Sequence, residues 1–290
     1  MSDYFNNVRR ILFWILLLNW AVALAKLAYG IITHCSSMVA DGVHSFSDGA
    51  TNVIGLLGIW IAAKPVDKNH PYGHKKYETF AALTVAFLLF LLALVIVHES
   101  LERLKRGLSP DVNFFSFVVI VVTMGVNIFV MVYEKNKGKA LGSDLLIADA
   151  LHTRSDILVS LGVIVALVSA RLGYPALDSI CAFIIAGFIV KTGFDIARCT
   201  TGVLCDSAAL AVGELRKVAM EIKGVKECHR IRTRGRADDI HVDLHLIVDR
   251  DMPVGVAHDI SDRVEEKIKR AVKGVTDVVV HIEPSPKSRV

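Results

Sequence analysis

The sequence predicts an all-α bundle of six membrane-spanning helices over residues 1–205, followed by a small α+β domain over residues 206–290. Three observations lead to this fold class. The chain of 290 residues is 53% hydrophobic, and its mean hydropathy of +0.49 is too high for one soluble domain. Long apolar runs stop near residue 206. Beyond that point, shorter helical and strand patterns alternate.

A spanning helix needs about 20 mostly apolar residues to cross about 30 Å of hydrocarbon. Residues 80–97 and 114–133 meet this requirement almost without interruption. Four other runs are mostly apolar but contain a few polar or charged groups, which are costly in lipid and therefore candidates for function. The predicted spans are residues 11–32, 38–61, 79–101, 113–134, 143–170 and 176–199.

The first run also has features of a signal peptide. Arg9 and Arg10 precede the apolar stretch, and Ala-Leu-Ala at 23–25 resembles a cleavage site. The stretch continues to Ile32, whereas a signal core has about 7–15 residues. We therefore expect a retained first helix.

Six spans place both termini on the same side of the membrane. The flanks on that side hold more Lys and Arg than the opposite flanks, so the positive-inside rule assigns both termini to the cytoplasm. Arg103, Lys105 and Arg106 lie on the opposite side and run against this assignment.

Composition excludes two classes of partner or site. The net charge is only +4, and Lys and Arg are mixed with acids along the tail, so a nucleic-acid partner is not expected. The five cysteines form no Cys-x-x-Cys pair and are odd in number, which predicts free thiols rather than disulfides or a thiolate metal site.

The tail has an αββαβ pattern that suits a small sheet with helices on one face. Helical periodicity covers residues 209–222 and 253–272, whereas alternating patterns predict strands at residues 226–234, 239–248 and 275–283.

A nine-residue pattern, A-D-x-x-H-x-x-S-D, occurs at residues 40–48 and again at residues 148–156. In each copy the His and Asp are four residues apart, so they share one helix face and can bind one ion together. The second and fifth helices run in opposite directions, and the estimated depths of the two copies allow them to meet inside the membrane. The four candidate ligands are His44, Asp48, His152 and Asp156.

Two imidazoles and two carboxylates suit tetrahedral Zn²⁺, whereas Mg²⁺ and Ca²⁺ prefer six or more oxygens. Co²⁺, Cd²⁺ and Fe²⁺ fit the same set. Because histidine must lose its proton to bind metal, we expect metal/proton antiport by alternating access. The alternative is structural: the four groups satisfy buried hydrogen bonds, and Asp41 and Asp149 cap helix starts. Asp41 and Asp149 are otherwise candidates for a proton relay.

These motifs, together with the segment Asp67 to Glu78 and the αββαβ tail, resemble the cation diffusion facilitator family over nearly the whole chain. The resemblance implies a homodimeric exporter with a ferredoxin-like or metallochaperone-like cytoplasmic domain. It implies transport-site ligands at the four positions named above. Some relatives have Asp in place of His44, and manganese-type members lack the His pair, so zinc is favoured and iron remains an alternative.

The resemblance also implies further sites. Asp67, His70 and His74 match a loop metal site, although Asp and His in a Pro/Gly turn are often only solvated. Lys76 and Asp206 match a salt bridge that joins the bundle to the other subunit, although each could be just a charge at the membrane edge.

In the tail, the resemblance implies a metal cluster at the dimer interface that senses Zn²⁺ as a regulatory ligand. Ile282 stands where some relatives carry a ligand, which leaves the coordination open. Strand histidines that bind no metal are the alternative. The implied ligands are His229, His245, His258, His281 and Glu283.

The sequence also bears on two other functions. A metal-dependent membrane enzyme is disfavoured because the chain has no His-Glu-x-x-His helix and no nucleophile motif. A metal-binding scaffold that does not transport stays an alternative. We expect a multi-pass protein of a prokaryotic inner membrane, because the chain lacks the long His-rich loop of some eukaryotic relatives.

Overall fold

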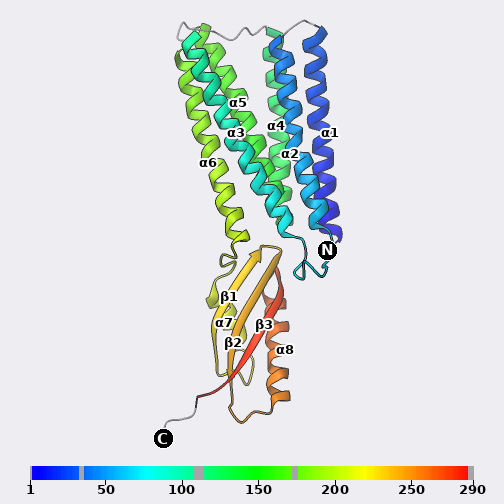
Figure 1. The fold of residues 1–290 in the computed structure, drawn as a ribbon, viewed down its shortest axis with the longest axis vertical. Helices are drawn as coiled ribbons and strands as arrows, with labels where there is room; N and C mark the ends of the chain where they lie inside the picture. Colours follow the sequence, from blue (N-terminus) through cyan, green and yellow to red (C-terminus); the bar gives the residue numbers. More distant parts are fainter. Residues whose placement is uncertain (1, 33–35, 107–113, 172–175, 287–290) are drawn as a thin grey trace. The chain divides into compact units, whose positions relative to one another are not determined.

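The computed structural model describes residues 2–32, 36–106, 114–171 and 176–286 (Figure 1). Two compact units, Met1–Thr200 and Thr201–Val290, divide the chain. The predicted fold class is confirmed: the first unit is helical, and the second is a small α/β domain. The long helices are α1 (Ser2–Ile32), α2 (Ser36–Ala62), α3 (Lys76–Arg106), α4 (Phe114–Leu141), α5 (Asp144–Arg171) and α6 (Ala176–Leu204).

Four helices are long and apolar enough to cross a membrane within the described residues: Asp3–Tyr29, Lys76–Glu102, Phe117–Leu141 and Ile180–Leu204. In α2, the described apolar stretch is Thr51–Ala62. Helix α5 carries Asp144, Asp149, Arg154 and Asp156 in its first half. Because charged groups are costly in lipid, these side chains are candidates for function.

Helix α1 begins nine residues before the predicted span, at Ser2 instead of residue 11. Its first turns are more polar than residues 11–32, and they continue the helix because Phe5 and Val8 are buried in the bundle core. Tertiary burial of these side chains stabilises the first turns.

Glycines bring neighbouring helices into close contact. A Cβ at Gly49 in α2 would overlap the Trp20 side chain of α1, and a Cβ at Gly58 would lie 2.5 Å from the Cβ of Ala81 in α3. Small residues at helix contacts are typical of membrane bundles, where helices associate through close packing. The outward faces carry large apolar side chains such as Trp14, Phe87 and Phe129.

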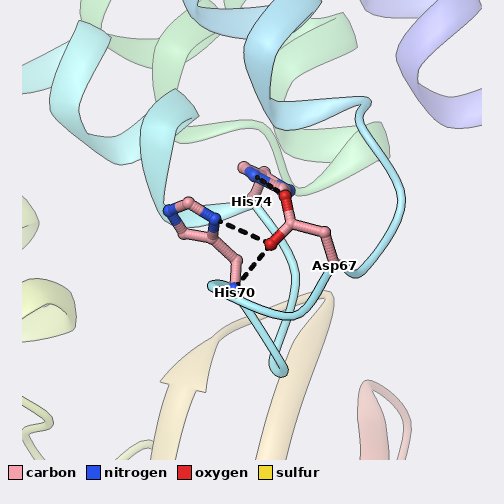
Figure 2. Close-up of side chains that lie close together, drawn as sticks. All are labelled: Asp67, His70 and His74. Carbon is pink, nitrogen blue, oxygen red and sulfur yellow. Dashed lines mark hydrogen bonds and ion pairs between the residues drawn. The ribbon is translucent and has the colours of Figure 1, made fainter.

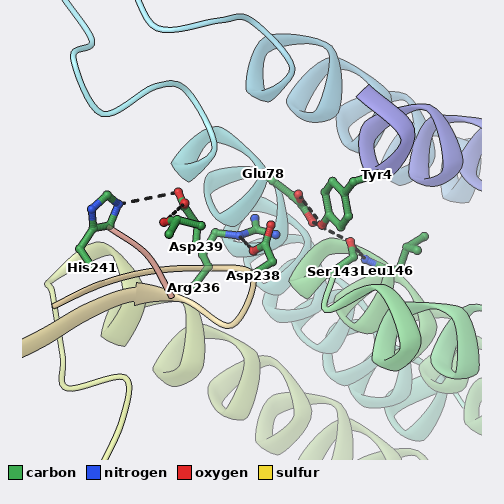
Figure 3. A network of polar contacts seen from close by, with 9 residues as sticks. Tyr4, Glu78, Ser143, Leu146, Arg236, Asp238, Asp239 and His241 are labelled. Atoms are coloured by element: carbon green, nitrogen blue, oxygen red, sulfur yellow. Dashed lines mark hydrogen bonds and ion pairs between the residues drawn. The ribbon is translucent and has the colours of Figure 1, made fainter. Parts of the chain in front are cut away.

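A polar network ties together one end of the bundle, where α1 and α3 begin and α4 turns into α5 (Figure 3). The fully buried Glu78 accepts hydrogen bonds from the Tyr4 hydroxyl, at 2.9 and 3.0 Å, and from Ser143 Oγ at 2.6 Å. The α4–α5 turn is tight because Gly142 has a positive φ of 71°. Ser143 Oγ also accepts the backbone N–H of Leu146, at 3.3 Å, in the first turn of α5.

The second unit contains α7 (Val212–Met220), β1 (Glu227–Arg236), β2 (Asp239–Val248), α8 (Val254–Ala271) and β3 (Val275–Pro284). The strands form one sheet in the order β1-β2-β3, with β1 and β2 antiparallel and β2 and β3 parallel. Alternate residues of β2 are buried, and they share one core with residues of α7 and α8. The helices therefore cover one face, and the other face presents the polar residues of β2.

The β1–β2 hairpin turn is held by its own polar groups (Figure 3). The buried Arg236 donates a hydrogen bond from Nε to Asp238 Oδ1 at 2.9 Å. Asp239 accepts a bond from Thr276 Oγ1 at 2.7 Å, and its carboxylate lies 3.9 Å from His241 Nε2. A bulge between His229 and Arg232 shifts the register of β1 and leaves His229 opposite His245.

Candidate metal sites

The α5 copy of the repeated pattern borders a small internal cavity. Asp149, His152 and Thr153 are buried, and Asp156 is half-buried. The cavity volume is about 30 Å³, which is enough for a water-sized occupant. Four helices line the cavity, through Asn19, Val22, Lys26, Ser45, Thr51, Thr123, Asn127, Asp149, His152, Thr153 and Asp156.

The α2 copy belongs to a helix that contacts α5. The side chains of Asp41, His44 and Asp48 lie outside the described residues. Ser45, the neighbour of His44, lines the same cavity as His152 and Asp156. A four-ligand site shared by α2 and α5 is therefore a proposal, which we develop below.

Asp149 lies inside α5, five residues after Asp144. It does not cap the helix, because Ser143 accepts the backbone N–H of Leu146 at the helix start. Asp149 instead accepts a hydrogen bond from the Asn52 side chain at 2.5 Å, and Asn52 accepts one from Asn19 Nδ2 at 3.0 Å. The proton-relay role remains a prediction for Asp149.

Glu134 of α4 is a buried acid that sequence reasoning missed. Its side chain is fully buried, and it accepts a hydrogen bond from Thr153 Oγ1 at 3.3 Å. Its carboxyl group also interacts with that of Asp149. Residue 134 ended the predicted fourth span, where a charge is unremarkable, so only the packing of α4 on α5 identifies it.

The α2–α3 loop brings Asp67, His70 and His74 together (Figure 2). One ligand atom from each residue lies within 4.8 Å of the other two. His70 Nδ1 is 3.1 Å from Asp67 Oδ1, and His74 Nε2 is 3.5 Å from Asp67 Oδ2. The donor set is one carboxylate and two imidazoles, a combination typical of zinc sites that keep a further position open.

Local backbone geometry fixes the position of the Asp67 carboxylate. The backbone N–H of His70 donates to Asp67 Oδ1 at 2.7 Å, and this bond lowers the pKa of the Asp67 carboxyl group. His74 is buried, and its Nδ1 finds no hydrogen-bond partner among the described residues. Gly73 supplies a positive φ of 83° at the bend before α3. The loop therefore holds an ionised carboxylate against two imidazoles.

In the tail, three strands place His229, His245 and Glu283 on the exposed face of the sheet. Glu283 Oε1 is 2.7 Å from His245 Nδ1, and Glu283 Oε2 is 3.1 Å from His229 Nε2. Their ligand atoms lie within 4.8 Å of one another. The hydrogen bond from His245 is the main reason that the pKa of Glu283 is lowered. This donor set fits a divalent transition metal.

The other two predicted tail ligands, His281 and His258, differ in their position relative to this cluster. His281 pairs with His245 in the register of β2 and β3, and its ring centroid is 4.6 Å from that of His245. His258 is exposed on α8, with its Nε2 3.7 Å from Asp262 Oδ2. Helix α8 packs on the opposite face of the sheet, so one chain does not bring His258 into this cluster.

Lys76 and Asp206 stand at the ends of helices. Lys76 is the first residue of α3, and Asp206 follows α6 with a positive φ of 56°. They belong to different structural units. Their predicted pairing across subunits stays a prediction.

Comparison with known proteins gives matches along most of the chain. The family model of the cation efflux transmembrane domain matches residues 12–205, and that of the cation efflux protein cytoplasmic domain matches residues 209–285. An uncharacterised transporter of Methanocaldococcus jannaschii is 32% identical over 91% of this chain and 94% of its own length.

Two further proteins are similar. The manganese efflux system protein MneS of Bacillus subtilis is 29% identical over 89% of both chains. The Zn form of CzrB, a candidate zinc transporter, has a solved structure that is 30% identical, with a TM-score of 0.25. That match covers 27% of this chain and 90% of the solved chain.

Proposed function

We propose that this chain, which belongs to the cation diffusion facilitator family of divalent metal-cation efflux transporters, exports Zn²⁺ in exchange for protons. It is a membrane protein, and members of its family are transporters rather than enzymes. We further propose that it works as a homodimer in a prokaryotic inner membrane with both termini in the cytoplasm.

The observation that carries this proposal is the buried cavity at the α5 repeat. His152 is 6% exposed, and it lines the same space as Asp156 on its own helix and Ser45 on α2. Ionisable groups inside a membrane bundle mark ion pathways, because burying them in a purely structural role is costly. His44 and Asp48 of α2 complete the proposed N₂O₂ ligand set with His152 and Asp156.

Zn²⁺ is favoured by the donor set. Two imidazoles and two carboxylates satisfy its tetrahedral preference, and Fe²⁺, Cd²⁺ and Co²⁺ are the nearest competitors. One relative is named for manganese efflux, so family membership alone does not select the metal. The choice of Zn²⁺ for this chain therefore rests on its own histidines.

Proton exchange follows from the same ligands. An imidazole must be neutral to bind a metal, so metal entry expels protons and proton entry expels the metal. Alternating exposure of the cavity to the two sides then couples the two flows. The interacting carboxyl groups of Asp149 and Glu134 are the proposed route by which protons reach the site.

The loop and tail clusters are proposed as accessory metal sites. Asp67, His70 and His74 would capture the ion before transport. His229, His245 and Glu283 would sense the cytoplasmic Zn²⁺ concentration, with His281 and His258 joining when two tails associate.

Uptake into proteoliposomes tests the transport function. Zn²⁺, Fe²⁺, Mn²⁺ or Cd²⁺ is added outside vesicles that hold the intact chain, under a proton gradient, and its uptake is measured. We expect Zn²⁺ flux that is abolished by Asp48→Ala or Asp156→Ala, and that reverses when the proton gradient is inverted. Asp195→Ala is the matched control, because Asp195 is exposed on α6 and does not line the cavity.

Two outcomes would contradict the proposal. A Zn²⁺ flux that does not depend on the proton gradient would exclude antiport. Folded protein that binds Zn²⁺ but moves no metal would favour the alternative function, a metal-binding membrane scaffold.

A further inference from the structure

Helix α1 contributes a buried lysine to the cavity at the α5 repeat. Lys26 is 7% exposed, and its Nζ donates a hydrogen bond to Ser45 Oγ of α2 at 2.9 Å. Lysine is the most strongly hydrated of the basic side chains, and lysines near helix ends usually extend toward water. A lysine that is held inside the bundle therefore requires negative charge around it.

The required negative charge faces the same small space. Lys26 lines the cavity together with Asp149, His152 and Asp156. The cavity volume is only about 30 Å³, so an ion bound by His152 and Asp156 would share this space with the lysine ammonium group. At such short range, in a medium of low dielectric constant, charges of equal sign repel strongly.

We propose that the Lys26 ammonium group is a built-in counter-cation, which neutralises the acidic cavity when no metal is present and which an arriving divalent cation must displace. This inference rests on the proposed function, and it deepens that function by assigning a positioning residue outside the ligand set. Lys26 weakens metal binding and thereby promotes release of the ion. It also stabilises the metal-free cavity, because buried carboxylates without a counter-charge are costly.

A purely structural role for Lys26 predicts a different result. If the lysine only ties α1 to α2 through Ser45, its replacement loosens the cavity, and Zn²⁺ binds more weakly or with unchanged affinity. A counter-cation predicts the opposite sign. Its replacement by a neutral side chain removes the repulsion, and Zn²⁺ binds more tightly.

The experiment measures Zn²⁺ affinity and thermal stability of the full-length protein in nanodiscs. The background carries His74→Ala and His245→Ala, so that the loop and tail clusters do not contribute. Lys26→Met, which keeps the length but not the charge, is compared with Lys26→Arg and with the unchanged background. We expect Lys26→Met to bind Zn²⁺ about tenfold more tightly, which corresponds to about 1.4 kcal/mol, and to unfold at a lower temperature without metal. Lys26→Arg should match the background in affinity.

Folded Lys26→Met with unchanged or weaker Zn²⁺ affinity would overturn the inference. If Lys26→Met does not fold without metal, Lys26→Gln takes its place, because its amide still donates to Ser45 while lacking the charge. Asp156→Ala, added to the background and to each Lys26 variant, should remove the high-affinity Zn²⁺ binding. Binding that survives Asp156→Ala would overturn the proposed transport site, and this inference with it, whereas an unchanged Lys26→Met affinity overturns the inference alone.

Discussion

Glu283 joins two histidines from different strands: its carboxylate lies 2.7 Å from His245 Nδ1 and 3.1 Å from His229 Nε2. Three strands meet in this contact. The parallel register of β2 and β3 sets Glu283 opposite Ile247, two residues beyond His245, and the antiparallel register of β1 sets His229 opposite His245. Sheet geometry thus holds the three side chains close together, an arrangement that would reduce the entropy lost if a metal ion bound to them.

Removal of Glu283 should abolish metal binding by the tail. The tail has a hydrophobic core of its own, and Glu283 contacts both His229 and His245. We expect calorimetry to show Zn²⁺ uptake by this domain and its loss in Glu283→Ala. His258→Ala is the matched control, because His258 lies outside the cluster of a single chain. Equal loss in the control would mean that two tails build the site together.

The loop cluster should bind its ion independently of the cavity. Asp67 contacts both His70 and His74, so Asp67→Asn removes the only negative charge of the donor set while nearly preserving its shape. We expect the full-length protein to lose about one bound Co²⁺ per chain, as measured by the visible absorption of tetrahedral Co²⁺. Asn69→Ala changes the same turn without removing a donor and should bind normally. A full Co²⁺ complement in Asp67→Asn would argue against the loop site.

The buried hydrogen-bond chain from Asn19 through Asn52 to Asp149 should stabilise the bundle. Asn52 donates to the Asp149 carboxylate, and Asn52→Ala leaves that buried acceptor without this donor. Loss of a hydrogen bond to a buried polar group typically costs about 1–3 kcal/mol. We expect a lower thermal midpoint in detergent than for Asn136→Ala, an exposed control on α4. Equal midpoints would mean that other donors replace Asn52.

The pattern of hydrophobic residues was sufficient to predict most elements of the fold. Strict alternation over residues 239–248 predicted β2 with the bounds that the structure has, Asp239–Val248. Long apolar runs likewise predicted the helices of the bundle. Helix α1 begins at Ser2, before the predicted span, because residues 2–10 are stabilised by tertiary burial of Phe5 and Val8 rather than by a local apolar run.

Candidate site residues were predictable from spacing alone only where they are close in sequence. His229, His245 and Glu283 lie on three different strands and were implied only by the family resemblance. The spacing within one loop predicted Asp67, His70 and His74 as candidate ligands, and a repeated pattern predicted His152 and Asp156. Glu134 and Lys26 gave no comparable signal. Glu134 ends an apolar run beside Lys135, Lys26 is a lone charge within an apolar run, and both make their contacts with other helices. His258, which the resemblance implied as a ligand, lies on the helix that covers the opposite face of the sheet, so its role stays a prediction for two associated tails.

Acid should remove one surface contribution to the stability of the tail. Lys226 Nζ donates to Asp249 Oδ2 at 2.6 Å, and this bond is the main reason that the pKa of Asp249 lies below its ordinary value of 3.8. Between the lowered pKa and the ordinary one, the unfolded chain binds more protons than the folded chain, so stability rises with pH. The contribution of this pair to stability is complete at pH values above the ordinary pKa of Asp249. It is lost as the pH falls through the lowered pKa of the folded chain.

Lys226→Met should therefore lower the thermal midpoint of the tail slightly at neutral pH and progressively less as the solution is acidified below about pH 4. The difference stays small because both groups are half exposed and their charges are screened by solvent. Lys223→Met, at an exposed lysine nearby, controls for the loss of one positive charge and should show no such pH dependence. A difference that persists in acid would mean that Lys226 acts through packing of its side chain, because protonation of Asp249 removes the ion pair but leaves the aliphatic contacts in place.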